Sequence, residues 1–244
     1  IEHVRLNTHH IFLHQEPYLL KLKPVSLTPE RRRQVNSSLD AVEHTAFRSL
    51  LCSILWLCLT RQDIVADVVQ LQQEMVCPRV IHLNELNALL RRAVKDKTLN
   101  GLHFGPLQGP LRLVGIGDSG QATKRSLYAQ EGRMVLLMED WYDTNSEWVS
   151  SQESSNLGGH GHPLFHSGKK ATRVSHSTSH AEALSAIGTT QVAQLISNRL
   201  TEPFASFLLY REFGWHVSSM DLAYVQEQCL HNIPVDHVTD CMDL

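Results

Sequence analysis

The sequence lacks the features that define several common protein classes. It has five cysteines, an odd number, and no two of them form a Cys-x-x-Cys pair, so neither a disulfide framework nor a zinc ribbon is indicated. Its longest mainly apolar run, residues 50–59, is shorter than the roughly 18 residues that a membrane helix needs. No signal peptide is visible at the first residues. We therefore expect an intracellular protein, cytoplasmic or nuclear, with no membrane partner.

The sequence also lacks an excess of positive charge. The formal net charge is −3, whereas a nucleic-acid-binding protein usually carries a basic footprint, so local basic clusters would have to supply one. The 244 residues, 42% of them hydrophobic, suffice for one large or two modest globular domains. The first residue is Ile1 and the last, Leu244, directly follows a strand-like run, so we expect both ends to be cuts in a longer chain.

Apolar spacing predicts a mainly helical first part. A short strand and a short helix are expected within residues 9–24, followed by a polar loop over 25–38. Three helices are predicted at 40–59, 63–76 and 80–97, where apolar residues recur every three or four positions. Glycine and proline at positions 101, 105, 106, 109 and 110 then interrupt regular structure. We place a domain boundary there, which gives domains of residues 1–104 and 108–244.

The second part has the pattern of a mixed α/β domain. A helix is predicted at residues 181–200, residues 203–230 are expected to add helix, and residues 140–168 resemble a long loop. Strands are predicted at four places, which are residues 111–117, 134–138, 172–177 and 235–239. The predicted order is therefore three strands, a helix and a further strand.

Three acidic residues occupy notable places in this order. Asp118 and Asp240 each follow a strand, and Glu182 lies in the first turn of the predicted helix. Adjacent strand ends in one sheet can bring such carboxylates together, and clustered carboxylates need a cation because they repel one another. Hard oxygen ligands select magnesium or manganese. Two such ions can stabilise the attacking and leaving oxygens when water cleaves a phosphodiester.

Several stretches, taken in order, resemble copia-type retrotransposon polyproteins. The stretch Phe-Arg-Ser-Leu-Leu-Cys-Ser-Ile-Leu-Trp-Leu at residues 47–57, with Thr-Arg-Gln-Asp-Ile at 60–64, is similar to a motif that follows the polymerase palm in that family. Four further stretches match segments before and after it, namely residues 14–19, 115–122, 169–183 and 237–241. The resemblance implies the end of a reverse transcriptase, thumb- or connection-like, followed by a ribonuclease H-like sheet with helices that is truncated at its C-terminus.

The resemblance also implies a function. Asp118, Glu182 and Asp240 would be catalytic metal ligands for two Mg²⁺ ions, with Mn²⁺ possible, and a fourth acid would lie beyond Leu244. The intact polyprotein would cleave the RNA strand of RNA–DNA hybrids inside a virus-like particle. Lys169, Lys170 and Arg173 flank the predicted third strand and are the candidates for binding the hybrid or another nucleic acid. The alternative is an inactive relic, or a fragment co-opted to bind nucleic acid without cutting it.

Each acid has a structural alternative. Ser179 and Glu182 have the spacing of a capping box, in which the glutamate would cap the helix rather than bind metal. Asp118 could end its strand by forming a turn. Asp236 and Asp243 compete with Asp240 for the third position.

Other clusters are given structural interpretations. Histidines 160, 162 and 166, with 176 and 180 nearby, could in principle bind zinc, but a solvated loop is the preferred interpretation. The same holds for basic residues 31–33 and 91–92, which we interpret as solvated faces rather than phosphate contacts.

Overall fold

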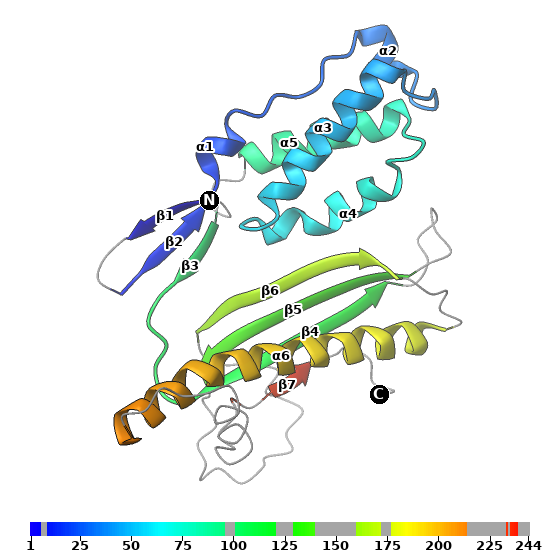
Figure 1. The fold of residues 1–244 in the computed structure, drawn as a ribbon. Coiled ribbons are helices and arrows are strands. Elements are labelled where there is room, and N and C mark those ends of the chain that lie inside the picture. Colours follow the sequence, from blue (N-terminus) through cyan, green and yellow to red (C-terminus); the bar gives the residue numbers. More distant parts are fainter. Residues whose placement is uncertain are drawn as a thin grey trace. The chain divides into compact units, whose positions relative to one another are not determined.

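The chain forms two compact units in a computed structural model. The first unit comprises residues 1–106 together with Gly168–Lys170, and the second comprises Leu107–Ser167 and Ala171–Leu244. Figure 1 shows the helices and strands of each unit. The structure describes residues 1–5, 9–95, 101–120, 129–139, 160–171, 177–213, 233 and 235–238. Assignment of the two units to a reverse transcriptase and a ribonuclease H stays a prediction.

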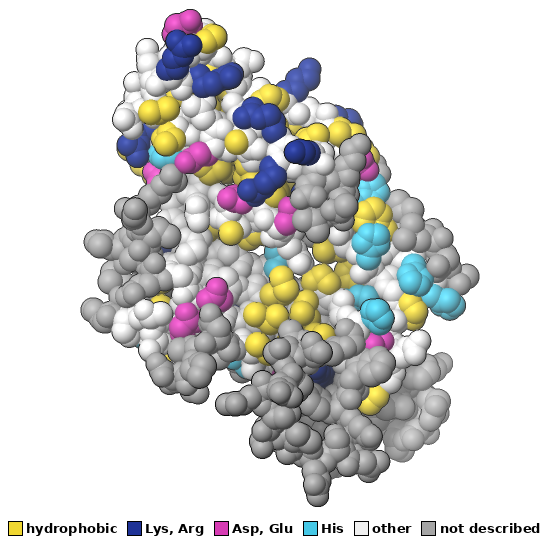
Figure 2. Space-filling view, turned by 180° about the vertical axis from the view of Figure 1, so that it is seen from behind, with side chains coloured by type: hydrophobic (Ala, Val, Ile, Leu, Met, Phe, Trp, Pro, Cys, Tyr) yellow, Lys and Arg dark blue, Asp and Glu magenta, His cyan; other side chains and the backbone are white. Residues whose placement is uncertain are grey.

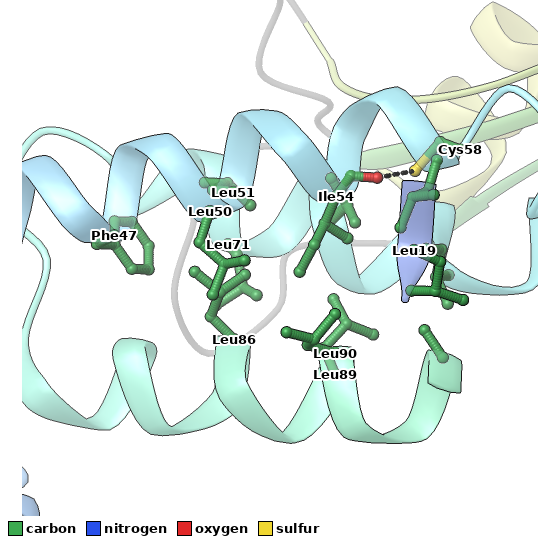
Figure 3. Close-up of a cluster of buried hydrophobic side chains, with 14 of the residues drawn as sticks. Leu19, Phe47, Leu50, Leu51, Ile54, Cys58, Leu71, Leu86, Leu89 and Leu90 are labelled. Atoms are coloured by element: carbon green, nitrogen blue, oxygen red, sulfur yellow. Dashed lines mark hydrogen bonds between the residues drawn. The ribbon is translucent and has the colours of Figure 1, made fainter. Parts of the chain in front are cut away.

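Three helices build the core of the first unit. They are α3 (Ala41–Leu57), α4 (Val65–Gln73, preceded by the 3-10 turn η1, Gln62–Ile64) and α5 (Val80–Lys95), which confirms the three predicted helices. Their apolar faces meet in one cluster (Figure 3), whose buried side chains include Phe47, Leu51, Ile54, Leu57, Ile64, Val68, Leu83, Leu86 and Leu90. Because these side chains are almost fully excluded from water, hydrophobic burial is the main stabilising contribution to this unit.

The first unit also contains short elements that the sequence only partly indicates. The strand β2 (Ile11–His14) and helix α1 (Glu16–Leu19) agree with the strand and helix predicted in residues 9–24. However, the predicted loop over 25–38 contains the short helix α2 (Pro29–Arg33), which begins after the N-cap Thr28. Here a proline at the first helical position and a threonine cap favour a helix that apolar spacing does not reveal.

A three-stranded antiparallel sheet completes the first unit. Its order is β1 (Glu2–Arg5), β2, β3 (Gly101–Phe104), so the prediction that residues 101–110 lack regular structure is wrong for the first four. A Cβ atom at Gly101 would lie 2.2 Å from the Leu13 carbonyl oxygen. Glycine therefore permits a close approach of the two strands here, rather than ending regular structure.

Helix α3 begins at a capping box that an arginine reinforces. The Asp40 carboxylate accepts from Glu43 N at 2.8 Å, and the Glu43 carboxylate accepts from Asp40 N at 3.0 Å. The Arg31 guanidinium donates two hydrogen bonds to Glu43, at 2.6 and 2.8 Å, and lowers the pKa of that carboxyl below its ordinary value. Of the three consecutive arginines 31–33, Arg31 thus stabilises the start of α3.

This ion pair predicts a pH dependence of stability. Because the pKa of Glu43 is lower in the folded than in the unfolded protein, its stabilisation is present above the ordinary glutamate pKa and is lost as the pH falls through the folded pKa. Glu43→Gln keeps the capping geometry but removes the charge, and should cost about 1 kcal/mol at pH 7. Chemical denaturation at a series of pH values should show this difference vanish in acid. A difference that stays constant down to pH 2 would contradict this explanation.

The second unit is a mixed α/β domain, as predicted. Its four-stranded sheet has the order β6 (Gly161–Lys170), β5 (Gln130–Glu139), β4 (Leu111–Gly120), β7 (Val235–Val238). Strands β4 and β5 are antiparallel, whereas β4 and β7 are parallel. The long helix α6 (Thr178–Phe213) runs across this sheet (Figure 1). Leu113, Val135 and Ala193 form the centre of the core between them.

Two predictions about this unit need correction. Residues 161–168, expected to lie in a loop, belong to strand β6, and Asp118 lies within strand β4 rather than after it. Residues 161–170 contain Gly161, Pro163 and Gly168, and their polar composition hides a strand that is fixed by hydrogen bonds to β5. Residues 140–159 of the predicted loop, and residues 172–176 of the predicted third strand, lie outside the described residues. Within the described ranges, no helix has the length and apolar character required to cross a membrane.

Candidate functional site

Asp118 lies near the end of the central strand β4. It pairs with Gly132 on β5 in an uninterrupted antiparallel register that continues to Gly120↔Gln130, and its side chain is exposed. Asp118 therefore does not form the turn considered as its structural alternative, because the strand continues on both sides of it.

Strand alternation fixes the direction of the Asp118 side chain. A Cβ atom at Gly117 would lie 2.6 Å from Thr189 Oγ1 of α6, and one at Gly115 would lie 3.1 Å from the Thr189 methyl group. Residues 115 and 117 thus face α6. Since successive strand residues point to opposite faces of a sheet, Asp118 projects from the face away from α6.

Glu182 lies in the second turn of α6 and is not a capping residue. The helix begins at Thr178, and Ser177 Oγ accepts a hydrogen bond from His180 N at 3.1 Å, so Ser177 is the N-cap. The capping box of Ser179 and Glu182, considered as the structural alternative, is therefore wrong, and so is the prediction that Glu182 lies in the first turn of its helix. Glu182 is only 6% exposed, and its Oε2 atom has no hydrogen-bond partner among the described residues.

The first turns of α6 are fixed to the main chain at Asp118. Ser185 Oγ lies 3.0 Å from the Asp118 carbonyl oxygen and 3.3 Å from that of Gly132, as a donor to both. Glu182 lies three residues before Ser185, about 4.5 Å along the helix axis. The structure thus brings Glu182 and Asp118 to the same end of β4. It does not bring their carboxylates onto the same face of the sheet.

The third acid, Asp240, lies outside the described residues, as do its competitor Asp243 and the basic residue Arg173. The other competitor, Asp236, accepts a hydrogen bond of 2.8 Å from the buried guanidinium of Arg112, so an ion pair between β7 and β4 explains it. Within the part of the chain that the structure describes, no group of three or more His, Cys, Asp or Glu side chains could hold a metal ion. This statement covers histidines 160, 162, 166 and 180 as well as the described acids.

Basic side chains gather over the first unit in Figure 2. Arg31 pairs with Glu43 and Arg92 pairs with Asp67, as expected for solvated faces that carry ion pairs. Lys169 and Lys170, the candidates for nucleic-acid contact, lie exposed at the end of β6.

Two known proteins are similar in sequence to most of this chain. The chain is 28% identical over 207 residues to a retrovirus-related Pol polyprotein from transposon RE1 of Arabidopsis thaliana, an alignment that covers 79% of the chain. It is 26% identical over 190 residues, 75% of the chain, to the corresponding polyprotein from transposon RE2 of the same plant. This sequence is related to retrotransposon Pol polyproteins. The resemblance predicted from the sequence motifs is thereby confirmed.

The chain spans a small part of these Pol polyproteins, 12% of the first and 11% of the second. No family model matches the chain. No solved structure matches it either.

The motif at residues 60–64, on which the predicted resemblance partly depends, has a structural role that sequence reasoning missed. Arg61 is 2% exposed, and its guanidinium donates to both carboxylate oxygens of Asp63 at 2.8 Å and to the Ala93 carbonyl at 2.9 Å. It therefore joins η1 to the last turn of α5. Thr60 donates to Gln15 Oε1 at 2.9 Å.

Gln15, in the stretch at residues 14–19, also takes part in these contacts. Gln15 Nε2 donates to the Trp56 carbonyl at 3.2 Å, so residues of two separate Pol-like stretches hold each other in place. The spacing Arg-x-Asp between two apolar segments was the signal that could have indicated this ion pair.

Three other partly or fully buried ionisable side chains, those of Cys58, His237 and Glu139, have structural environments and no indicated catalytic role. Burial raises the pKa of the Cys58 thiol to about 11, so this cysteine is protonated at neutral pH and is not a nucleophile. Burial lowers the pKa of His237, which lies on β7 with its Nδ1 atom 3.5 Å from Thr190 Oγ1 of α6. The buried Glu139 accepts from the main-chain nitrogens of Gln108 and His160, at 2.8 and 3.0 Å, and so fixes the segments beside β5.

Proposed function

We propose that the chain is the segment of a retrotransposon Pol polyprotein that joins the end of a reverse transcriptase to a ribonuclease H-like domain. In the intact polyprotein, this domain cleaves the RNA strand of RNA–DNA hybrids inside the cell. Asp118, Glu182 and Asp240 are assigned as ligands of Mg²⁺ or Mn²⁺. Lys169, Lys170 and Arg173 are assigned to the nucleic-acid surface.

The observation that carries the proposal is the position of β7 beside β4. The two strands are parallel, and their register ends at Ile116↔Val238. Asp118 follows Ile116 by two residues, and Asp240 follows Val238 by two residues in the sequence. Helix α6, which carries Glu182, is bonded to β4 at Asp118 itself. The described segments β4, β7 and the start of α6, which carry or directly precede the assigned acids, therefore meet at one end of β4.

The donor atoms suit a hard divalent cation. Three carboxylates would provide oxygen ligands, and the buried Glu182 Oε2 atom needs a partner that no described residue supplies. Asp118 projects from the other face of β4, so the fit rests on the chemistry of the donor atoms and not on their described placement. When bound, such a cation would supply positive charge to the phosphodiester and lower the pKa of a water molecule. The contribution of the chain itself is to hold Glu182 away from solvent and to fix its helix through Ser185.

The test is cleavage of a labelled RNA–DNA hybrid by the purified chain in Mg²⁺ or Mn²⁺. Asp118→Asn and Glu182→Gln should each lower the rate at least 100-fold, whereas Asp236→Asn, in an acid that pairs with Arg112, should retain activity if the protein folds. Equal cleavage by wild type, Asp118→Asn and Glu182→Gln would reject the assigned site.

A second function, nucleic-acid binding without cleavage, is favoured by one observation. The Asp118 side chain projects from the face of β4 away from α6, whereas Glu182 lies on α6 at the other face, so the two carboxylates do not form a binding site on one face. This function predicts that the wild type binds the hybrid with a salt-dependent affinity but cleaves nothing with either ion. Substitution of Lys169 and Lys170 by alanine should then weaken binding, while Asp118→Asn should leave it unchanged.

A further inference from the structure

Two buried polar atoms between β4 and α6 have no hydrogen-bond partner among the described residues. They are Ser119 Oγ and Glu182 Oε2, on side chains that are 4% and 6% exposed. A buried polar group without a partner is costly, and most such groups in folded proteins are satisfied by protein or by an ordered water molecule. These two atoms are complementary, because the hydroxyl can donate and the carboxylate can accept.

The two residues lie on the same side of the sheet and at the same end of it. Ser119 follows Gly117 by two residues in an uninterrupted strand, so it faces α6 as Gly117 does. Glu182 precedes Thr189 by seven residues, about two helical turns, so both lie on the same side of α6. Since Thr189 is the residue that contacts position 117, Glu182 lies over the next part of β4, where Ser119 is.

Arg133 of β5 is a described cation on the same face of the sheet, and one of its nitrogens is engaged. Glu131, which pairs with Ser119 in the β4–β5 register, accepts a hydrogen bond of 2.7 Å from the Arg133 guanidinium. Arg133 also lies directly against Gly188 of α6, where a Cβ atom would come within 2.2 Å of it. The Nη2 atom of the guanidinium is therefore held beside Glu131, while its Nε atom is buried without a partner among the described residues. Of these two buried donors on the α6 face, the Ser119 hydroxyl belongs to the later part of β4, over which Glu182 lies.

We propose that Ser119 is a positioning residue for Glu182, acting through one ordered water molecule. The hydroxyl of Ser119 donates to this water, and the water donates to Glu182 Oε2. The arrangement holds the carboxylate in one orientation between β4 and α6. Its consequence for cation binding rests on the proposed function, but the link between the two side chains does not.

The link is tested by a double-mutant cycle on the free energy of unfolding, without metal or substrate. Ser119→Ala should raise the unfolding equilibrium constant about five- to tenfold in the wild-type background. In a Glu182→Leu background, the same substitution should have no more than a twofold effect, because no carboxylate remains to be oriented. Ser119→Thr keeps the hydroxyl and should behave as the wild type.

A matched control uses a hydroxyl remote from Glu182. Ser197 Oγ donates to the Ile233 carbonyl at 3.0 Å, and Ser197→Ala should have the same effect in both backgrounds. Additive effects of Ser119→Ala and Glu182→Leu would overturn the proposal.

A second measurement links the pair to the proposed function. If Glu182 binds Mn²⁺, Ser119→Ala should weaken Mn²⁺ affinity by roughly tenfold, and Ser119→Thr should restore it. A wild-type protein that binds no Mn²⁺ would refute the metal assignment, while the cycle would still decide whether Ser119 and Glu182 are coupled. Unchanged Mn²⁺ affinity in a folded Ser119→Ala protein that binds the ion would refute the positioning role.

Discussion

Replacing Arg61 by alanine is expected to destabilise the first unit by about 3 kcal/mol or more, a large part of the stability of a domain. The guanidinium is buried, and its hydrogen bonds include two to Asp63 and one to the Ala93 carbonyl. Its removal leaves the carbonyl without its donor, Asp63 without its counter-ion and a cavity between η1 and α5. The free energy of unfolding, measured by chemical denaturation, tests this expectation.

The chain offers a matched control in a second arginine–aspartate pair. Arg92 and Asp67 also form a salt bridge, but their side chains are 53% and 44% exposed. Arg92→Ala should cost less than about 1 kcal/mol, because exposed ion pairs contribute little. Arg61→Lys should lower the free energy of unfolding almost as much as Arg61→Ala does, since an ammonium group cannot reproduce the paired hydrogen bonds to Asp63. Equal effects of Arg61→Ala and Arg92→Ala would contradict the structural role given to residues 60–64.

Replacing Gly117 by alanine is expected to destabilise the second unit by about 1–3 kcal/mol. The added Cβ would lie 2.6 Å from Thr189 Oγ1 and 3.3 Å from the Ser185 carbonyl oxygen. Thr189 Oγ1 donates to that same carbonyl at 2.8 Å, so the hydroxyl cannot turn away without losing its bond. The helix must therefore move away from β4, which would also disturb Glu182.

Gly132 provides the control for this substitution. It lies opposite Asp118 on β5, and a Cβ atom there would meet nothing within 4 Å. Gly132→Ala should therefore change the melting temperature little, or raise it slightly, because alanine restricts the unfolded chain. Thr189→Ala should recover part of the loss caused by Gly117→Ala. The packing of α6 described above would be contradicted if both glycine substitutions lowered the melting temperature equally.

The sequence predicted the elements whose signal is local and missed those fixed by distant contacts. The helices α3, α4 and α5 were predicted from apolar residues at helical spacing, and β7 was predicted from the short strand-like run at residues 235–239. Strand β6 was missed because its glycines and histidines have no strand pattern, and its pairing with β5 is a tertiary interaction. The helix α6 was predicted to begin at residue 181 but begins at Thr178, because Ser177 caps it.

The candidate site was predictable only as a set of residue types. Family resemblance indicated Asp118 and Glu182, and the structure places both at the same end of β4. The sequence could not indicate that Asp118 faces away from α6, because the face depends on the register of β4 against β5. Nor could it separate Ser119 from the other serines, because an unpaired buried hydroxyl is recognised only in the folded protein.

The central claim is that Asp118, Glu182 and Asp240 bind a common divalent cation, and paramagnetic broadening of backbone NMR signals by Mn²⁺ tests it most directly. Titration with low amounts of Mn²⁺ should broaden the amide signals around all three acids first, and Asp118→Asn should abolish that broadening. Broadening confined to surface carboxylates such as Asp67, or unaffected by Asp118→Asn, would contradict the claim.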